Sequence, residues 1–150
     1  MENILTLFLK VRERFDEIKE KVSLAKPYLE LLIFSNGWAL KIEELEKILK
    51  FKPEFIYKSN EENYAILIRY RIDDDATTGI IAHEFAEIIA RENNIEEQEL
   101  IDKICVERGF GEQLLYALKN EVLPEIAEES LINGQDLKKR IENLENMLKS

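Results

Sequence analysis

The segment from Asp73 to Asn94, DDDATTGIIAHEFAEIIARENN, has the pattern of one capped helix that is buried on nearly all sides. Asp75 or Thr77 can cap its start, and the run of three aspartates suits the positive end of a helix dipole. Apolar residues recur on two sides of the segment, which is typical of a helix at the centre of a domain. We therefore expect a central helix over residues 75–93.

One face of this helix carries bulky side chains, and the opposite face carries small ones around two polar groups. The bulky face comprises Thr78, Ile81, Phe85, Ile88 and Ile89. The other face comprises Ala76, Gly79, Ile80, His83, Ala86, Glu87 and Ala90. Helical residues four apart are neighbours, so His83 and Glu87 can bind one ion together. Glu84, about 100° away around the helix, would lie beside that ion.

The five-residue segment HEFAE at 83–87 differs at one position from HExxH, a helical motif of zinc proteases. In that motif two histidines four apart bind the metal and the glutamate between them acts as general base. The chain's single histidine, His83, takes the first position, and Glu87 stands at the second histidine position. A carboxylate-rich ligand set suits Mn²⁺ or Fe²⁺ better than a set with two histidines, and selects zinc less strongly. The alternative interpretation is that His83 is a hydrogen-bonded core residue, paired with Glu87, that stabilises the fold alone.

Composition places the chain among globular proteins with a single domain. Its 150 residues, 45% hydrophobic and 35% charged, suffice for one sizeable core but not for two. A net charge of −10 without a Lys/Arg cluster argues against nucleic-acid binding. No apolar run has the length of a membrane span, and one cysteine, Cys105, permits no internal disulfide, so we expect a cytoplasmic protein. Abundant Glu, Lys and Ile with few Gly and Pro are typical of heat-adapted proteins.

The fold we predict is α+β: a helix-dominated single domain with a small antiparallel β-hairpin packed against the central helix. Helical spacing of apolar residues predicts N-terminal helices over 3–22, 28–34 and 40–51. β-branched and aromatic residues at 55–57 and 64–72, separated by a polar loop, predict the hairpin. The predicted segments of the domain 1–150 are N-terminal helices (1–52), hairpin (53–72), central helix (75–93), following helices (95–132) and a C-terminal helix (135–150).

Both ends of the chain are predicted to be amphipathic helices. At the C-terminus, Leu137, Ile141, Leu144 and Leu148 follow close to heptad spacing. Such a short repeat suits an arm that docks on its own chain or forms a dimer. These helices are therefore candidate surfaces for a homo-oligomer or a protein partner.

The order of predicted elements resembles the core of small gluzincin metallopeptidases. These elements are the hairpin, the HExx(E) helix, a short turn and the helix from Glu97 to Phe110. In that family a strand precedes the HExxH helix, and the following helix brings a glutamate in an ExExD-like context before a Gly-aromatic turn. The resemblance covers residues 64–110 and none of the flanks. It differs in register at the aspartate, since Ile101 stands where the family tends to carry it and Asp102 comes one residue later.

The resemblance implies His83 as metal ligand, Glu84 as general base and Glu97 as third ligand, with Glu87 in place of the second histidine. Glu97 has a second interpretation, as the N3 partner of Asn94 in a capping box. Two functional classes follow. The first is a non-catalytic, degenerate zincin-like protein that acts through helix-mediated assembly or metal binding. The alternative is a metal-dependent peptidase that uses a divalent ion, either zinc or, given the carboxylates, manganese or iron.

Overall fold

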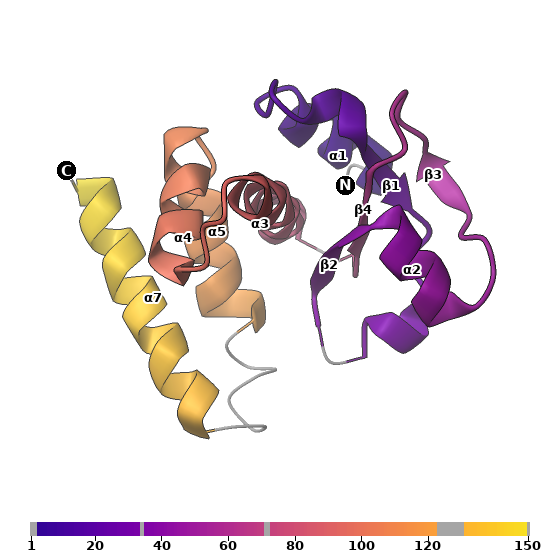
Figure 1. Cartoon of the computed structure of the whole chain (residues 1–150). Coiled ribbons are helices and arrows are strands. Elements are labelled where there is room, and N and C mark those ends of the chain that lie inside the picture. Colours follow the sequence, from indigo (N-terminus) through magenta and orange to yellow (C-terminus); the bar gives the residue numbers. More distant parts are fainter. Residues whose placement is uncertain (1–2, 34, 71–72, 123–130, 150) are drawn as a thin grey trace.

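The fold is an α+β domain in which helices cover both faces of a four-stranded mixed sheet (Figure 1). It is seen in a computed structural model that describes residues 3–33, 35–70, 73–122 and 131–149. The strands are β1 (Val22–Ala25), β2 (Gly37–Lys41), β3 (Phe55–Tyr57) and β4 (Tyr64–Ile68). The α-helices are α1 (Ile4–Arg12), α2 (Ile42–Leu49), α3 (Asp74–Glu92), α4 (Gln98–Glu107), α5 (Gly111–Ala117) and α7 (Leu131–Lys149). Short 3₁₀ turns η1 (Lys19–Lys21) and η2 (Leu29–Leu31) and a π turn η3 (Leu118–Val122) complete the described elements.

The predicted hairpin over residues 53–72 is wrong, because its two strands are not neighbours in the sheet. The strand order is β2-β4-β1-β3. β1 lies between β4 and β3 and pairs parallel to β4 but antiparallel to β3. Of the residues of β1, only Val22 lay in a predicted helix, as the last residue of the helix expected over 3–22, and the strand itself was not predicted. All four of them are buried, as expected of a strand with neighbours on both sides. Residues 71 and 72 of the predicted hairpin lie outside the described residues.

The sheet separates two apolar cores because side chains alternate along each strand. Tyr64, Ile66 and Ile68 of β4 join the larger core, which also contains residues of α1, α3, α4 and α5. Ala65 and Leu67, which alternate with them, join a smaller core with residues of α2. Figure 1 shows α2 and α3 on opposite sides of the sheet. The sheet thus presents one face to α3, the helix that carries the HExxE residues.

The predicted central helix is confirmed, with α3 running from Asp74 to Glu92. Most of its residues are buried, and it contacts α1, α4, α5, β2 and β4. Its cap is Asp73, whose carboxylate accepts hydrogen bonds from the backbone N–H groups of Asp75 at 2.8 Å and Ala76 at 3.2 Å. The predicted caps Asp75 and Thr77 are therefore wrong, because both residues lie inside the first turn.

The N-terminal helices differ most from the prediction. The helix expected over 3–22 ends at Arg12, and the chain then turns through η1 into β1. The helix expected over 28–34 is only the short turn η2, and Phe34 lies outside the described residues. The third, expected over 40–51, is confirmed as α2, although residues 40 and 41 of the predicted span belong to β2.

The C-terminal half is helical as predicted. The following helices are α4 and α5, while residues 123–130 of the predicted segment 95–132 lie outside the described residues. The C-terminal helix α7 begins at Leu131, four residues before the start predicted at residue 135. It docks on its own chain, with Leu137 and Leu144 buried in the larger core. Among the described residues, no helix combines the length and apolar character needed to cross a membrane.

We predict that Gly79→Ala destabilises the domain, because α3 and α5 touch backbone to backbone at this position. A Cβ atom on Gly79 would lie 2.3 Å from the carbonyl oxygen of Gln113. Alanine in an unconstrained helix stabilises by about 1 kcal/mol relative to glycine, but overpacking here should cost about 2 kcal/mol net. The measurement is urea unfolding, with Thr78→Ala as the neighbouring control. An unchanged or increased free energy of unfolding for Gly79→Ala contradicts the packing.

Candidate functional site

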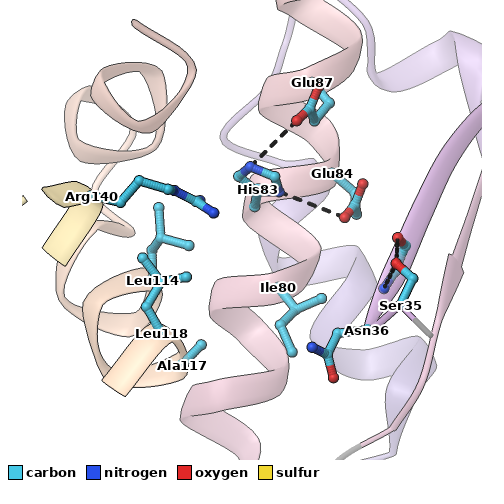
Figure 2. A pocket seen from close by; sticks show the side chains of 11 residues that line it. Ser35, Asn36, Ile80, His83, Glu84, Glu87, Leu114, Ala117, Leu118 and Arg140 are labelled. Atoms are coloured by element: carbon cyan, nitrogen blue, oxygen red, sulfur yellow. Dashed lines mark hydrogen bonds and ion pairs between the residues drawn. The ribbon is translucent and has the colours of Figure 1, made fainter. Parts of the chain in front are cut away.

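The HExxE residues of α3 line a cavity of about 240 Å³ between the start of β2 and the helices α5 and α7 (Figure 2). His83, Glu84 and Glu87 form its polar side. The apolar wall is formed by Ile80, Leu114, Ala117 and Leu118. Arg140 reaches in from α7, and Ser35, Asn36 and Gly37 close the side next to the sheet.

The imidazole of His83 lies between the two carboxylates of its own helix. Its Nδ1 is 3.6 Å from Oε2 of Glu84, and its Nε2 is 3.4 Å from Oε1 of Glu87. The side chains of His83 and Glu84 are only 17% and 10% exposed, whereas Glu87 is 37% exposed. The site therefore has a buried inner carboxylate and an outer one that meets solvent.

A hydrogen-bonded chain joins His83 to α4 and α7. Nε2 of Gln98 lies 3.0 Å from Nε2 of His83 and donates to Oδ1 of Asp102 at 3.0 Å. Arg140 donates to both carboxylate oxygens of Asp102, at 3.1 and 3.0 Å. Asp102 is 1% exposed, so its charge is neutralised by a two-point contact with the guanidinium. Three helices are thus linked through one buried carboxylate.

This chain of contacts determines which ring nitrogen of the neutral imidazole carries the proton. Asp102, paired with Arg140, only accepts hydrogen bonds, so the Gln98 atom that faces it is the amide nitrogen. The second N–H of that nitrogen points to Nε2 of His83, which accepts. The neutral ring then carries its proton on Nδ1, toward Glu84.

The pKa of His83 and the pKa of Glu87 both lie above their ordinary values. Burial lowers the pKa of His83, but its contact with Glu84 and the negative charges of Glu84 and Glu87 outweigh burial and the nearby Arg140. Burial raises the pKa of Glu87, and the charges of Glu84 and Asp102 act in the same direction. Each group therefore holds a proton more readily than it would in water.

The structure brings together some of the predicted site residues but not all. His83, Glu84 and Glu87 open on one cavity. Glu97 does not line it: this residue is exposed and is the N-cap of α4, one position before the helix begins. The capping box of Asn94 and Glu97 is wrong, because Asn94 adopts a left-handed conformation in the preceding turn and Glu97 makes no side-chain cap.

Sequence reasoning missed Gln98, Asp102 and Arg140. Gln98 and Asp102 are four residues apart and share a face of α4, one position beyond Glu97 and Ile101 in register. The position of Asp102, one residue later than the aspartate of the family pattern, was the sequence signal available for Gln98 and Asp102. Arg140 lies 38 residues from its partner Asp102, and no local pattern points to it.

The residues present do not fit a three-ligand metal site. His83 and Glu87 supply two donors, and the nearest side chain of α4 is an amide that is already held by Asp102. Within the described residues, no group of three or more His, Cys, Asp or Glu side chains could hold a metal ion. The one cysteine, Cys105, is fully buried, and burial raises the pKa of its thiol, which disfavours the nucleophilic thiolate.

Comparisons of the chain with protein family models, with characterised proteins and with solved structures found no match.

We predict that the single histidine resonance titrates with a pKa above 6.5, and that Glu84→Gln lowers this pKa more than Glu87→Gln does. Glu84 makes the larger of the two contributions that raise it, so removal of its charge lets burial dominate. NMR of the imidazole protons measures the pKa directly. Because the folded pKa exceeds the unfolded one, the stabilisation by His83 is fully present below pH ~6.5 and is lost as pH rises through the folded pKa. An unchanged pKa in Glu84→Gln contradicts this arrangement.

We predict that Arg140→Met destabilises the domain by about 2 kcal/mol, because it leaves the Asp102 carboxylate buried without its cation. Asp102→Asn should cost a similar amount. The double variant should cost less than the sum of the two, since neither charge then remains alone. Urea unfolding of the four proteins gives the coupling free energy, and Lys139→Met, an exposed neighbour on α7, is the control. Additive effects of the two substitutions would show that the pair is not coupled.

Proposed function

We propose that this chain is a non-catalytic, zincin-like protein whose HExxE helix binds a ligand without hydrolysing it. The observation that carries this proposal is the position of Gln98. Its amide nitrogen lies 3.0 Å from the imidazole nitrogen that would face a metal, and Asp102 holds the amide in place. A metal at His83 would have to displace this hydrogen bond and break the chain of contacts to Arg140.

The electrostatics of the site support binding over hydrolysis. Hydrolysis of the zincin type needs a metal-bound water whose proton passes to a free carboxylate. Glu84 stands where that base is expected, but it lies beside His83 in a site with only two metal donors. The same carboxylates can hold the polar end of a small molecule. The apolar wall of the cavity suits the rest of such a ligand.

Assembly through the amphipathic ends of the chain is a weaker basis for function. The apolar residues of α1, among them Phe8 and Val11, are buried in the larger core, as are Leu137 and Leu144 of α7. A partner could reach these side chains only if the helices left the domain. The open cavity at His83 is accessible without such a change.

The second candidate is a metal-dependent peptidase. One observation favours it: His83, Glu84 and Glu87 open on a single cavity that a substrate can reach. In this alternative His83 and Glu87 bind zinc, manganese or iron, Glu84 is the base, and Glu97 or Gln98 must move to supply a third donor. The cofactor of this alternative would be that divalent ion.

Metal analysis of protein purified without an affinity tag separates the two candidates. We predict that the bound metal is well below one ion per chain, and that His83→Ala leaves this content unchanged. Gln98→Glu should increase zinc affinity, because it places a third anionic donor beside His83 and Glu87. Glu97→Gln is the matched control and should change nothing. Near-stoichiometric metal that His83→Ala removes would establish the peptidase candidate and overturn the proposal.

A further inference from the structure

We propose that the cavity beside His83 binds a primary alkylammonium group, with Glu84 and Asn36 accepting its N–H donors and the apolar wall holding its alkyl chain. This inference rests on the proposed function, since it names the ligand class of the same site. It follows from three features of the cavity: unused acceptors, surplus negative charge and an apolar wall of matching size.

The cavity contains hydrogen-bond acceptors whose capacity the described residues do not fill. The side chain of Glu84 is 10% exposed, and the Nδ1–H of His83 that faces it lies 3.6 Å away, beyond a normal hydrogen bond. Oδ1 of Asn36 is buried and has no hydrogen-bond partner in the described part of the chain. Buried acceptors without donors carry a desolvation cost that a donor-bearing ligand removes.

Gly37 brings these two acceptors to the same wall. A Cβ atom on this residue would lie 3.0 Å from Oε2 of Glu84, so the backbone at the start of β2 rests against that carboxylate. Asn36 is the residue before Gly37 and also lines the cavity. Both acceptors therefore border the same cavity. Figure 2 shows Glu84 and Asn36 on the side of the cavity next to the sheet.

The charge balance of the cavity selects a cation. Glu84 and Glu87 contribute two carboxylates. His83, which lies between these carboxylates, offsets at most one of their charges, and both oxygens of Asp102 already engage the guanidinium of Arg140. A carboxylate ligand would meet repulsion here. A primary ammonium offers three rotatable donors and one positive charge, which matches the surplus.

The opposite wall selects an alkyl chain. Ile80, Leu114 and Leu118 present aliphatic side chains, and Ala117 leaves space between them. A volume of about 240 Å³ lies below the usual range for drug-sized ligands, so the ligand has a short chain of a few carbon atoms. The head group can belong to a free amine or to the N-terminus of a peptide with an aliphatic first residue.

Calorimetry and the His83 resonance test this inference with n-butylammonium as the probe. Butyrate has a similar chain length with the opposite charge, and n-butanol has the same alkyl chain without charge. We expect saturable binding of n-butylammonium with a shift of the His83 resonance, and affinities at least about tenfold weaker for the other two. Leucinamide represents the N-terminus of a peptide with an aliphatic first residue. If its affinity exceeds that of n-butylammonium, the site is assigned to peptide N-termini. Equal or tighter binding of butyrate overturns the inference.

Substitutions locate the bound amine. Glu84→Gln keeps the size of the side chain and removes its charge, so affinity for n-butylammonium should fall by about tenfold or more. Asn36→Asp adds a carboxylate on the same wall and should tighten binding without filling the cavity. Glu97→Gln, on the exposed start of α4, should have no effect. Affinity that is unchanged in both Glu84→Gln and Asn36→Asp places the amine elsewhere and overturns the inference.

The two proposals fail in different ways. Stoichiometric zinc removed by His83→Ala overturns the proposed function, whatever the amine does. Absence of n-butylammonium binding by a metal-free, folded protein overturns this inference and leaves the non-catalytic assignment standing.

Discussion

Burial of α3 on all sides is the constraint on which the rest of the structure depends. The sheet, α1, α4 and α5 all pack against this one helix, and at Gly79 its backbone approaches that of α5 so closely that no side chain fits. A helix enclosed in this way carries its polar residues into the interior. His83, Glu84 and Glu87 are therefore partly desolvated, and their charges interact strongly with one another.

The contacts that His83 makes with α4 depend on a buried ion pair between Asp102 and Arg140. The free-energy cost of removing Asp102 and Arg140 from water offsets most of the free energy of their attraction. The pair therefore adds little net stability compared with apolar residues. It does specify geometry. Two hydrogen bonds from the guanidinium fix Asp102, and Asp102 fixes Gln98 over the imidazole. The position of α7 on α4 thus determines which group faces His83.

Sequence patterns predicted what local periodicity controls and missed what depends on distant partners. α3 and α2 follow from apolar spacing, and the grouping of His83 with Glu87 follows from their four-residue separation. β1 was missed because it directly follows an amphipathic segment, of which Val22 was predicted as the last helical residue, and only pairing with β4 and β3 shows that a strand forms there. Arg140 reaches the site from the last helix, and nothing near it in the sequence predicts its partner.

The difference between Glu97 and Gln98 is one residue, and it decides the chemistry of the site. Gln98 is the first residue of α4 and faces His83, whereas Glu97 precedes the helix in extended conformation and is exposed. The left-handed conformation of Asn94 ends the turn after α3 such that α4 begins at Gln98. A shift by one residue would bring Glu97 over His83, but it would also rotate Asp102 away and leave Arg140 without its carboxylate. Because the buried ion pair opposes that shift, the helix is held in the register that presents an amide to the imidazole.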